Sequence, residues 1–498
     1  MHMRLRTSSG AVLAAAALLF AASSARGQTD GFVLHCLSAR AAGLGCVTRG
    51  QEGIPTTLFH DPAGIASFDR PALEVNLTAF VPALSFRNGA NAQGADGALH
   101  GYPMGSVAYV GRKLAGGRLA WALGMEPIGG FGSDFKLTNP VLGAAQNYES
   151  FFAAVKAGPT LAWELAPGLS VGASASLVYG QVRDFRMPFS MLATTAAGLG
   201  AMMQMDPHYA TLFSGMPELT AYGDSKAFAG TGVSGDLGVS WRVSPRLRLS
   251  ASWSPKSALN LSGGTASIDM SKQFQAMFGA LVAERMQNHG ETAAQAQATV
   301  QQLLGSAGLN LSLGTSGRYD AALDMALPQT VGVGGTWKPA RGWTLALEGG
   351  WMGWKSAEHV LPFKLTNGSN PNLNILINAN PTNGSFTYPF PLHWQDSWIG
   401  KLGVERTVGS GALRAGYAYG NNPVPANAVF ITFPAIVEHS AMVGTTVRLG
   451  GFPLDLAVVH AFDKCLDGAN ANLMGTEYQG SETHLQETVV TVGTVLRL

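Results

Sequence analysis

Few residues of this sequence have the types and spacings that catalysis or metal binding requires. The 11 histidines are scattered, and no two of them stand at a spacing typical of a metal site. Residues 230–235 read Gly-Thr-Gly-Val-Ser-Gly and match the dinucleotide-binding fingerprint letter by letter, but they lack the strand, turn and helix that give it meaning. No serine and histidine stand out as the nucleophile and base of a phospholipase. We therefore predict that the protein is not an enzyme, has no catalytic residues and binds neither a metal nor a cofactor.

Cysteine chemistry is limited to one short loop. Cys36 and Cys46 lie close together, whereas Cys465 is far from both. An oxidising compartment allows the near pair to form a disulfide, and closing such a short loop contributes on the order of 3 kcal/mol. We predict a Cys36–Cys46 disulfide, with three free thiols as the alternative.

The first 25 residues have the pattern of a secretory signal peptide. Arg4 and Arg6 precede an apolar run at 11–22, which is too short to span a bilayer as a helix. Small residues at 23–25 offer a cleavage site. We place the signal peptide at 1–25, with an uncleaved anchor as the alternative, so the mature chain begins outside the cytoplasm.

Composition limits the classes that remain. Only 13% of the residues are charged and the formal net charge is +1, which gives no electrostatic reason to expect a nucleic-acid partner. No run of 18 apolar residues follows the signal peptide. An exported chain of this kind is either a soluble periplasmic protein or a membrane β-barrel, whose backbone polar groups are paired between strands.

Apolar residues alternate with small or polar residues over many short segments, as in strands that have two different faces. After the Pro167-Gly168 turn, the odd positions 169–179 are apolar or aromatic, and most even positions are serine or glycine. Fourteen candidate strands begin near residues 72, 103, 117, 149, 168, 230, 247, 327, 342, 397, 412, 438, 453 and 488. An even number is expected for a bacterial outer-membrane barrel.

The lengths of the connections indicate the same architecture. Short turns alternate with long connections, among them 188–229, 264–325 and 360–396. Outer-membrane barrels have short turns on the periplasmic side and long loops outside. We predict an all-β, fourteen-stranded antiparallel transmembrane barrel over 72–498, in the bacterial outer membrane, with partly helical external loops.

The lumen of such a barrel must be filled or left open to water. Residues 26–71 precede the first strand and are rich in glycine and alanine. We interpret this segment as a plug inside the barrel.

Three further regions follow one another in an order that is shared with a known family. They are residues 38–45 with Asp61-Pro62-Ala63-Gly64 and Phe68, then Leu327-Pro328 and 331–334 with Trp351 and Trp354, and finally 414–419 with Pro423-Val424-Pro425. Over nearly the whole mature chain, the sequence resembles the FadL-type outer-membrane transporters of hydrophobic compounds. It departs from their pattern at Asp61, where asparagine is typical, and at Leu498, where a final aromatic residue is usual.

The resemblance implies a fourteen-stranded barrel whose N-terminal hatch, residues 26–71, includes Asp61, Pro62 and Ala63. It implies that external loops capture the substrate, which binds inside the barrel. Movement of the hatch then releases the substrate sideways, through an opening in the wall at a kinked third strand. Known substrates of the family are long-chain fatty acids and aromatic hydrocarbons. We expect a hydrophobic small-molecule ligand, contact with outer-membrane lipid, and a monomer.

Apolar residues in two long connections are candidates for capturing that ligand. They are Phe274, Met277, Phe278 and Leu281, at helical spacing, and Met202, Met203, Met205, Phe213 and Met216, in the connection 188–229. Methionine suits irregular apolar ligands because its side chain is flexible. The alternative is that the two connections pack on each other as a small core of their own.

The third strand contains the residues that could interrupt the wall. Pro127 lacks a ladder donor, and Gly129 and Gly130 permit a bulge or bend. The residues alone slightly favour an ordinary turn that leaves the strand, whereas the resemblance favours a lateral opening.

A fatty-acid carboxylate would require a cation on the inner face. Arg183, Arg186, Lys256 and Lys401 are the candidates by alternation or position. The alternative for each is a solvated or paired charge of the lumen.

Two other functions remain open for such a barrel. A passive porin for polar solutes would have an open, charge-lined lumen, and a structural or adhesive surface protein would depend on its external loops. The ligand itself cannot be read from the sequence.

Overall fold

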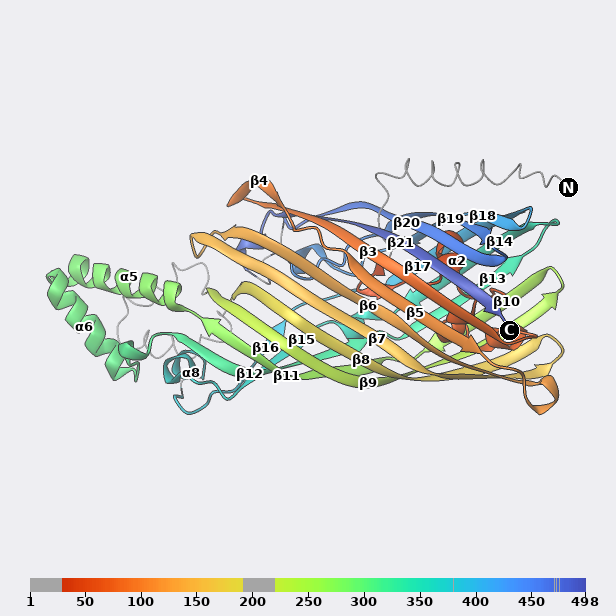
Figure 1. The fold of residues 1–498 in the computed structure, drawn as a ribbon. Helices are drawn as coiled ribbons and strands as arrows, with labels where there is room; N and C mark the ends of the chain where they lie inside the picture. Colours follow the sequence, from red (N-terminus) through yellow and green to blue (C-terminus); the bar gives the residue numbers. More distant parts are fainter. Residues whose placement is uncertain (1–28, 191–219, 379, 470, 472, 474) are drawn as a thin grey trace.

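The structure, a computed structural model, describes residues 29–190, 220–378, 380–469, 471, 473 and 475–498 (Figure 1). The signal peptide predicted at 1–25 lies outside these residues. The chain forms one closed antiparallel β-barrel, with a folded segment inside it and helices at one end.

Fourteen strands make the wall, as the alternation predicts. In chain order they are β3 (Ala72–Asn88), β5 (Tyr102–Val110), β6 (Leu119–Asn139), β7 (Ala144–Ala166), β8 (Leu169–Ser190), β9 (Thr220–Ser244), β10 (Leu247–Ser254) continued by β11 (Ser257–Asp269), β12 (Ser316–Leu327) continued by β13 (Thr330–Trp337), β14 (Trp343–Met352), β17 (Ser397–Val408), β18 (Gly411–Gly420), β19 (His439–Leu449), β20 (Phe452–Asp467) and β21 (Glu482–Arg497). The last strand pairs with the first along its whole length, from Glu482 opposite Arg87 to Arg497 opposite Ala72, and so closes the cylinder.

The two ends of the barrel differ, as the connection lengths predict. Turns such as Gly168 and Gly450–Gly451, whose glycines have positive φ, join strands at the end where the chain terminates. We call this the short-turn end, and the opposite one the long-loop end. The long-loop end carries β4 (Asn91–Asp96), α5 (Ser271–His289), α6 (Ala293–Ser306), β15 (Leu361–Thr366), α8 (Pro371–Asn378) and β16 (Phe386–Phe390). A short helix, α7 (Trp354–Ala357), places Trp354 against the segment inside the barrel.

Several strands extend further than the alternation indicates. β9 begins at Thr220 and β12 at Ser316, so parts of the connections expected at 188–229 and 264–325 are strand. Beyond the membrane a strand can be polar on both faces, and no alternating pattern then marks it. Of the described residues, no helix is long and apolar enough to cross a membrane.

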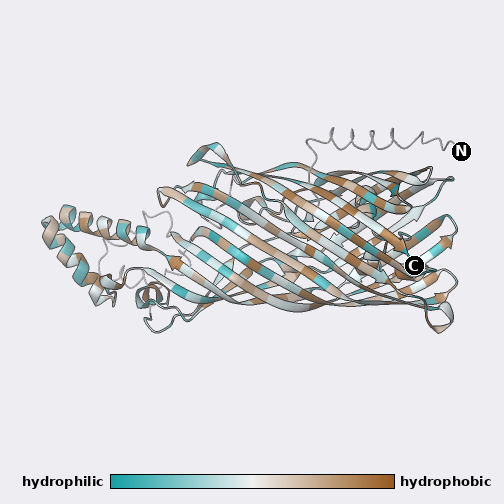
Figure 2. Ribbon diagram, in the orientation of Figure 1, coloured by the Kyte–Doolittle hydropathy of each residue, from teal (hydrophilic) through white to brown (hydrophobic). Residues whose placement is uncertain are grey.

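The outer face of the wall is apolar because its environment is lipid. Leu77, Val233 and Leu347 expose 69%, 74% and 64% of their surface, although all are large aliphatic residues. Along the strands of the barrel, hydrophobic residues alternate with less hydrophobic ones (Figure 2). No described residue covers these side chains, which is the arrangement of a protein that bilayer lipid surrounds.

Residues 29–71 lie inside the barrel and are named the lumen segment here. It contains β1 (Thr29–Asp30), β2 (Val33–Leu34), α2 (Ala39–Gly43) and two 3₁₀ turns, η1 (Pro55–Phe59) and η2 (Pro62–Ser67). Most of its residues are buried. A disulfide joins Cys36 to Cys46, with their Cα atoms 5.5 Å apart, while Cys465 is free and exposed.

The turns of the lumen segment are fixed by local capping. The Ser38 hydroxyl accepts a hydrogen bond from the backbone N–H of Ala41 at the start of α2. The Asp61 carboxylate accepts from the N–H of Gly64 at 3.1 Å and, from a neighbouring turn, from the N–H of Gly50 at 2.9 Å. Burial raises the pKa of Asp61. The acid at this position therefore fastens two turns to each other.

Candidate functional site

The barrel wall is incomplete between its second and third strands. β5 pairs with β6 only from Val107 to Val110, opposite Met125 to Ala122. β6 in contrast pairs with β7 along its whole length, with a register shift between Pro127 and Gly129. Residues 102–106 of β5 therefore have no partner on β6, and we call this opening the wall gap.

The break in pairing has a local cause in β6. Pro127 has no N–H to donate to a neighbouring strand. The register shift beside it marks a local irregularity of the strand, of the kind that interrupts regular pairing. The proline and the glycines predicted at this position thus lie in a continuous strand rather than in a turn that leaves the barrel.

The lumen segment contacts β6 directly at the wall gap. Val33 pairs with Gly129 in antiparallel register, and the N–H of Gly130 donates to the carbonyl oxygen of Phe32 at 3.0 Å. A Cβ on Gly129 would lie 1.8 Å from that same oxygen. This close contact is therefore possible because residue 129 has no side chain.

A cavity of about 430 Å³ lies at the wall gap. Its apolar lining includes five aromatic rings, and the Tyr102 and Phe151 rings are 5.7 Å apart. Its polar lining includes Arg183, which lies over the Phe151 ring at 4.3 Å and pairs with Asp184 at 2.9 Å. The lining aromatic residues are Phe80, Tyr102, Phe131, Phe151 and Phe152. Such a lining can hold an apolar molecule by burial and ring contacts.

Deeper in the lumen, the cavity meets a group of rings that we name the aromatic cluster. The Phe131 ring contacts Phe433 at 3.8 Å and Phe152 at 5.2 Å. Phe32 of the lumen segment contacts Phe152 at 5.5 Å and Trp354 at 4.9 Å. The members of the cluster are Phe32, Phe131, Phe152, Trp354, Trp394 and Phe433.

Part of this cluster comes from a loop that folds into the barrel. Residues 421–438 connect β18 to β19, and Phe430, Ile431, Phe433 and Ile436 in it are almost completely buried. The alternation of residues along the chain does not mark this loop as part of the interior. The signal that could have revealed it is the uncharged apolar run at 428–437, which a water-exposed connection would not contain.

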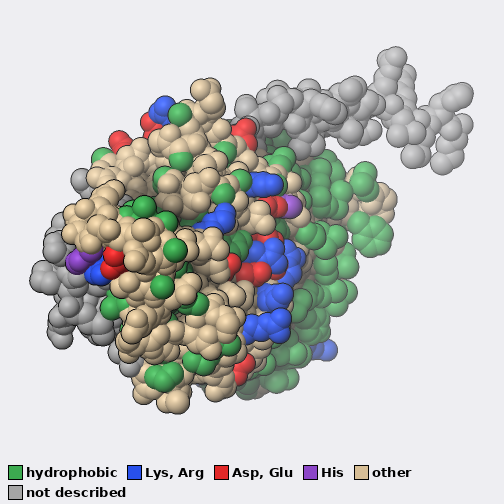
Figure 3. Space-filling model, turned by 90° about the vertical axis from the view of Figure 1, so that its left-hand side faces the viewer, with side chains coloured by type: hydrophobic (Ala, Val, Ile, Leu, Met, Phe, Trp, Pro, Cys, Tyr) green, Lys and Arg blue, Asp and Glu red, His purple; other side chains and the backbone are tan. Residues whose placement is uncertain are grey.

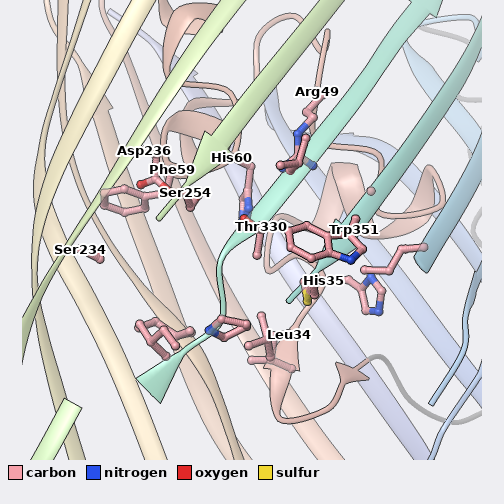
Figure 4. A pocket seen from close by; sticks show the side chains of 18 of the residues that line it. Leu34, His35, Arg49, Phe59, His60, Ser234, Asp236, Ser254, Thr330 and Trp351 are labelled. Carbon is pink, nitrogen blue, oxygen red and sulfur yellow. Dashed lines mark hydrogen bonds between the residues drawn. The ribbon is translucent and has the colours of Figure 1, made fainter. Parts of the chain in front are cut away.

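A smaller cavity of about 110 Å³ lies between the lumen segment and the wall (Figure 4). From the lumen segment it is lined by Leu34, His35, Arg49, Phe59 and His60, and from the wall by Ser234, Asp236, Ser254, Thr330 and Trp351, among others. The charged residues Arg49, Glu348 and Lys401, which hold the lumen segment to the wall, also line this cavity.

Glu348 of β14 is the main anchor of the lumen segment. Its carboxylate accepts hydrogen bonds from the backbone N–H groups of Thr48 and Arg49, at 2.7 and 2.9 Å. It also pairs with the guanidinium of Arg49 at 2.7 Å and the ammonium of Lys401 at 2.9 Å. The network is buried, so both cations depend on this one carboxylate.

Asp30 forms a second anchor. Its carboxylate accepts hydrogen bonds from the Trp354 indole at 2.8 Å and from the Ser397 hydroxyl at 2.7 Å. Burial raises the pKa of Asp30 to about 6. Burial lowers the pKa of His35, nearby in the lumen segment, to about 3, so its ring is neutral at physiological pH.

The structure separates the cations predicted to bind a carboxylate. Arg186 is fully engaged, because Glu149, Asp184 and Asp224 surround it at 2.8 to 3.4 Å. Lys401 belongs to the Glu348 anchor, and Lys256 donates to the carbonyl of Ser356. Arg183 lies in the wall-gap cavity with 66% of its side chain exposed. Of the four, only Arg183 lines that cavity.

The predicted capture residues are only partly brought together. Met277 and Leu281 are buried in α5, where they pack with Val300 and Leu304 of α6 and their neighbours. Phe274 and Phe278 are partly buried against the same core. Met202, Met203, Met205, Phe213 and Met216 lie outside the described residues. Seen from the long-loop end, apolar side chains are mixed with basic and acidic ones (Figure 3).

The predicted hatch residues lie where the lumen segment touches the wall. Asp61 caps η2, and Pro62 and Ala63 stand against Gly172 of β8, where an added Cβ would lie 2.5 Å from their backbone atoms. Within the described residues, no group of three or more histidine, cysteine, aspartate and glutamate side chains is placed to hold a metal ion.

Comparison with known proteins decides the family. A family model described as "Outer membrane protein transport protein (OMPP1/FadL/TodX)" matches residues 19–484. The chain belongs to this family. The family resemblance, the barrel fold and the outer-membrane location predicted from the sequence are thereby confirmed. The OMPP1/FadL/TodX proteins are transport proteins, and no curated protein gives a significant sequence match to this chain.

Solved structures support the same fold. The Pseudomonas putida toluene transporter TodX is similar with a TM-score of 0.65 at 15% identity, covering 94% of this chain and 99% of its own. A Pseudomonas aeruginosa FadL homologue is similar with a TM-score of 0.66 at 14% identity, with the same coverage. The Ralstonia pickettii toluene transporter TbuX is similar with a TM-score of 0.61 at 13% identity, covering 92% of this chain and 98% of its own.

Proposed function

We propose that this member of the OMPP1/FadL/TodX family takes up small hydrophobic molecules, binds them at the aromatic cluster and releases them sideways into the outer membrane. The observation that carries the proposal is the wall gap between β5 and β6, with its aromatic cavity. An apolar molecule at this position can enter lipid without crossing the polar region around Glu348. Long-chain fatty acids and aromatic hydrocarbons both have the required apolar character.

In this proposal the lumen segment acts as a hatch. It closes the inner side of the wall gap through the contacts of Phe32 and Val33 with β6. Displacement of β2 from Gly129 and Gly130 would connect the aromatic cluster to the cavity at the gap. The rest of the segment can remain fixed by the Glu348 anchor during such a movement.

The porin alternative requires an open lumen. The buried lumen segment and the buried loop 421–438 argue against it, because both occupy the interior that polar solutes would cross. A steady, large ohmic current through the purified protein in planar bilayers would favour the porin. We expect only small or brief currents.

Locking the wall gap tests the proposal. If the register of the paired stretch is continued, Gly105 stands opposite Pro127. In a Cys465→Ser background, the pair Gly105→Cys and Pro127→Cys should lower uptake of radiolabelled oleate and toluene when oxidised, and a mild reductant should restore it. The matched control is Tyr109→Cys with Leu123→Cys, which joins residues that are already paired. Unchanged uptake in the locked protein, with the cross-link shown by mass spectrometry, would contradict release through the gap.

A further inference from the structure

A cavity of about 550 Å³ lies at the short-turn end, away from the aromatic cluster and the wall gap. Four arginines line it, but only one acidic side chain, Asp455, does so. The arginines are Arg40, from α2 of the lumen segment, and Arg414, Arg448 and Arg497, from the wall strands β18, β19 and β21. The excess of positive charge requires an explanation, since the transport pathway does not pass through these residues.

Arg414 is neutralised by two carboxylates. Its guanidinium binds Glu405 at 2.6 Å and Asp455 at 3.1 Å, and it is almost completely buried. It also donates to the Thr446 hydroxyl at 2.7 Å. This arginine is therefore a structural part of the wall.

The other three arginines are less well neutralised: Arg40 shares Glu405 with Arg414, and within the described residues Arg448 and Arg497 pair with no carboxylate. Arg40 lies 3.5 Å from a Glu405 oxygen that Arg414 already binds more closely. Arg448 donates to the uncharged carbonyl oxygens of Ser410 and Gly451. Across the described residues, the side chain of Arg497 has no hydrogen bond or ion pair.

Two of these guanidinium groups converge on one point. A Cβ added to Gly53 of the lumen segment would lie 3.4 Å from Nη2 of Arg497 and 3.6 Å from Nη1 of Arg40. Gly53 has a φ of +73°, so another residue would be strained there as well as filling this space. Two like charges that face one small space repel each other unless an anion lies between them.

We propose that this cavity binds a phosphate group, with Arg40, Arg448 and Arg497 as its donors. Arginine presents a planar set of N–H groups that matches phosphate oxygens, and its charge is retained at any physiological pH. Because Arg40 and Gly53 belong to the lumen segment and Arg448 and Arg497 to the wall, the bound anion ties the two together. The inference is independent of which molecule the protein transports.

The phosphate can come from a lipid headgroup or from solution. The cavity opens beside Phe452 and Leu498, which are 66% and 65% exposed at the rim of the barrel. Exposed apolar residues next to basic ones are typical of a protein surface at the level of lipid headgroups. The same donors would accept free inorganic phosphate.

Calorimetric titration of the full-length barrel tests the site, first with inorganic phosphate in a non-ionic detergent. A second arm uses native mass spectrometry with short-chain phosphatidylglycerol, and with phosphatidylcholine for comparison. We expect saturable binding in at least one arm, weakened about tenfold or more by Arg497→Gln, since one charge-assisted contact is lost. Binding of the lipids without inorganic phosphate would identify a headgroup site, and the reverse a site for the free anion.

Two further variants keep the result interpretable. Arg246→Gln removes an exposed arginine from another turn at the short-turn end and should leave binding unchanged. Gly53→Ala places a methyl group between the two guanidinium groups without removing charge, and should weaken binding as strongly as Arg497→Gln. Heat-modifiable migration in gels shows whether each barrel is folded. Absence of binding in both arms, or an equal loss in folded Arg246→Gln, would overturn the proposal.

Discussion

The backbone N–H of Gly130 donates to the carbonyl oxygen of Phe32 at 3.0 Å, and this bond joins the lumen segment to β6 just beyond the point where the pairing of β6 with β5 ends. One residue earlier, Gly129 pairs with Val33. The same short stretch of β6 therefore forms the edge of the wall gap and contacts the lumen segment. Any movement of the segment at this position changes access to the gap.

Gly129→Val should separate the lumen segment from β6. An added Cβ would lie 1.8 Å from the Phe32 oxygen, which belongs to backbone and cannot move without the segment. We expect more frequent or larger openings in planar bilayers than in the parent protein. Gly400→Val is the control, because a Cβ at that position meets nothing within 4 Å. Equal currents in the two variants would show that the contact does not hold the segment.

Glu348→Gln should destabilise the protein strongly. The change leaves Arg49 and Lys401 buried without their carboxylate, a situation that typically costs about 3–5 kcal/mol. The free energy of unfolding in urea measures the loss, and protease sensitivity of residues 29–71 shows whether the segment is released. Glu482→Gln breaks an exposed pair with Arg87 and should cost less than about 1 kcal/mol. Similar losses in both variants would refute the anchoring role of Glu348.

The Asp30 anchor should make stability fall as the pH rises. Burial raises its pKa from 3.8 to about 6, so the folded state retains a proton that the unfolded state loses. The stabilisation is complete below about pH 4 and disappears as the pH passes 6. Asp30→Asn should abolish this contribution, which is measured as the difference in urea midpoint between variant and parent from pH 4 to 7. A difference that does not vary with pH would contradict the assignment.

The burial of His35 should make the stability of the protein fall as the pH decreases, over a pH range that overlaps that of Asp30. Burial lowers its pKa from 6.5 to about 3. Between these two pH values the unfolded state binds a proton that the folded state does not bind. Its contribution is complete above about pH 6.5 and is lost as the pH falls toward 3. His35→Gln should therefore make the protein less sensitive to acid in the same urea series. Greater acid sensitivity in this variant would show that the buried ring is not neutral.

The alternation of residues predicted the barrel because lipid and lumen impose different requirements on the two faces of each strand. It could not predict the full length of β9 or β12, since outside the membrane both faces meet water. Pro127 marked the third strand as interrupted, but the extent of the wall gap depends on where pairing with β5 ends, and no local pattern encodes this. Likewise, the pairing of Arg186 with Asp224 depends on a contact between separate strands.

Arg183→Gln should distinguish acidic from neutral substrates. Arg183 lines the cavity at the wall gap and, among the described residues, pairs with one carboxylate, Asp184, whereas Arg186 pairs with three. A fatty-acid carboxylate near the Phe151 ring would gain a charge-assisted hydrogen bond from Arg183, and a hydrocarbon would not.

We expect Arg183→Gln to weaken oleate binding about tenfold, as the loss of one hydrogen bond to a charged group implies, and to leave toluene binding unchanged. Competition with a fluorescent fatty acid measures the first affinity, and equilibrium partitioning of radiolabelled toluene the second. Lys256→Gln is the control, because Lys256 is also an exposed cation but does not line this cavity. Equal oleate affinity in all three proteins would mean that the gap accepts its ligand by apolar contact alone, and that the carboxylate remains in water.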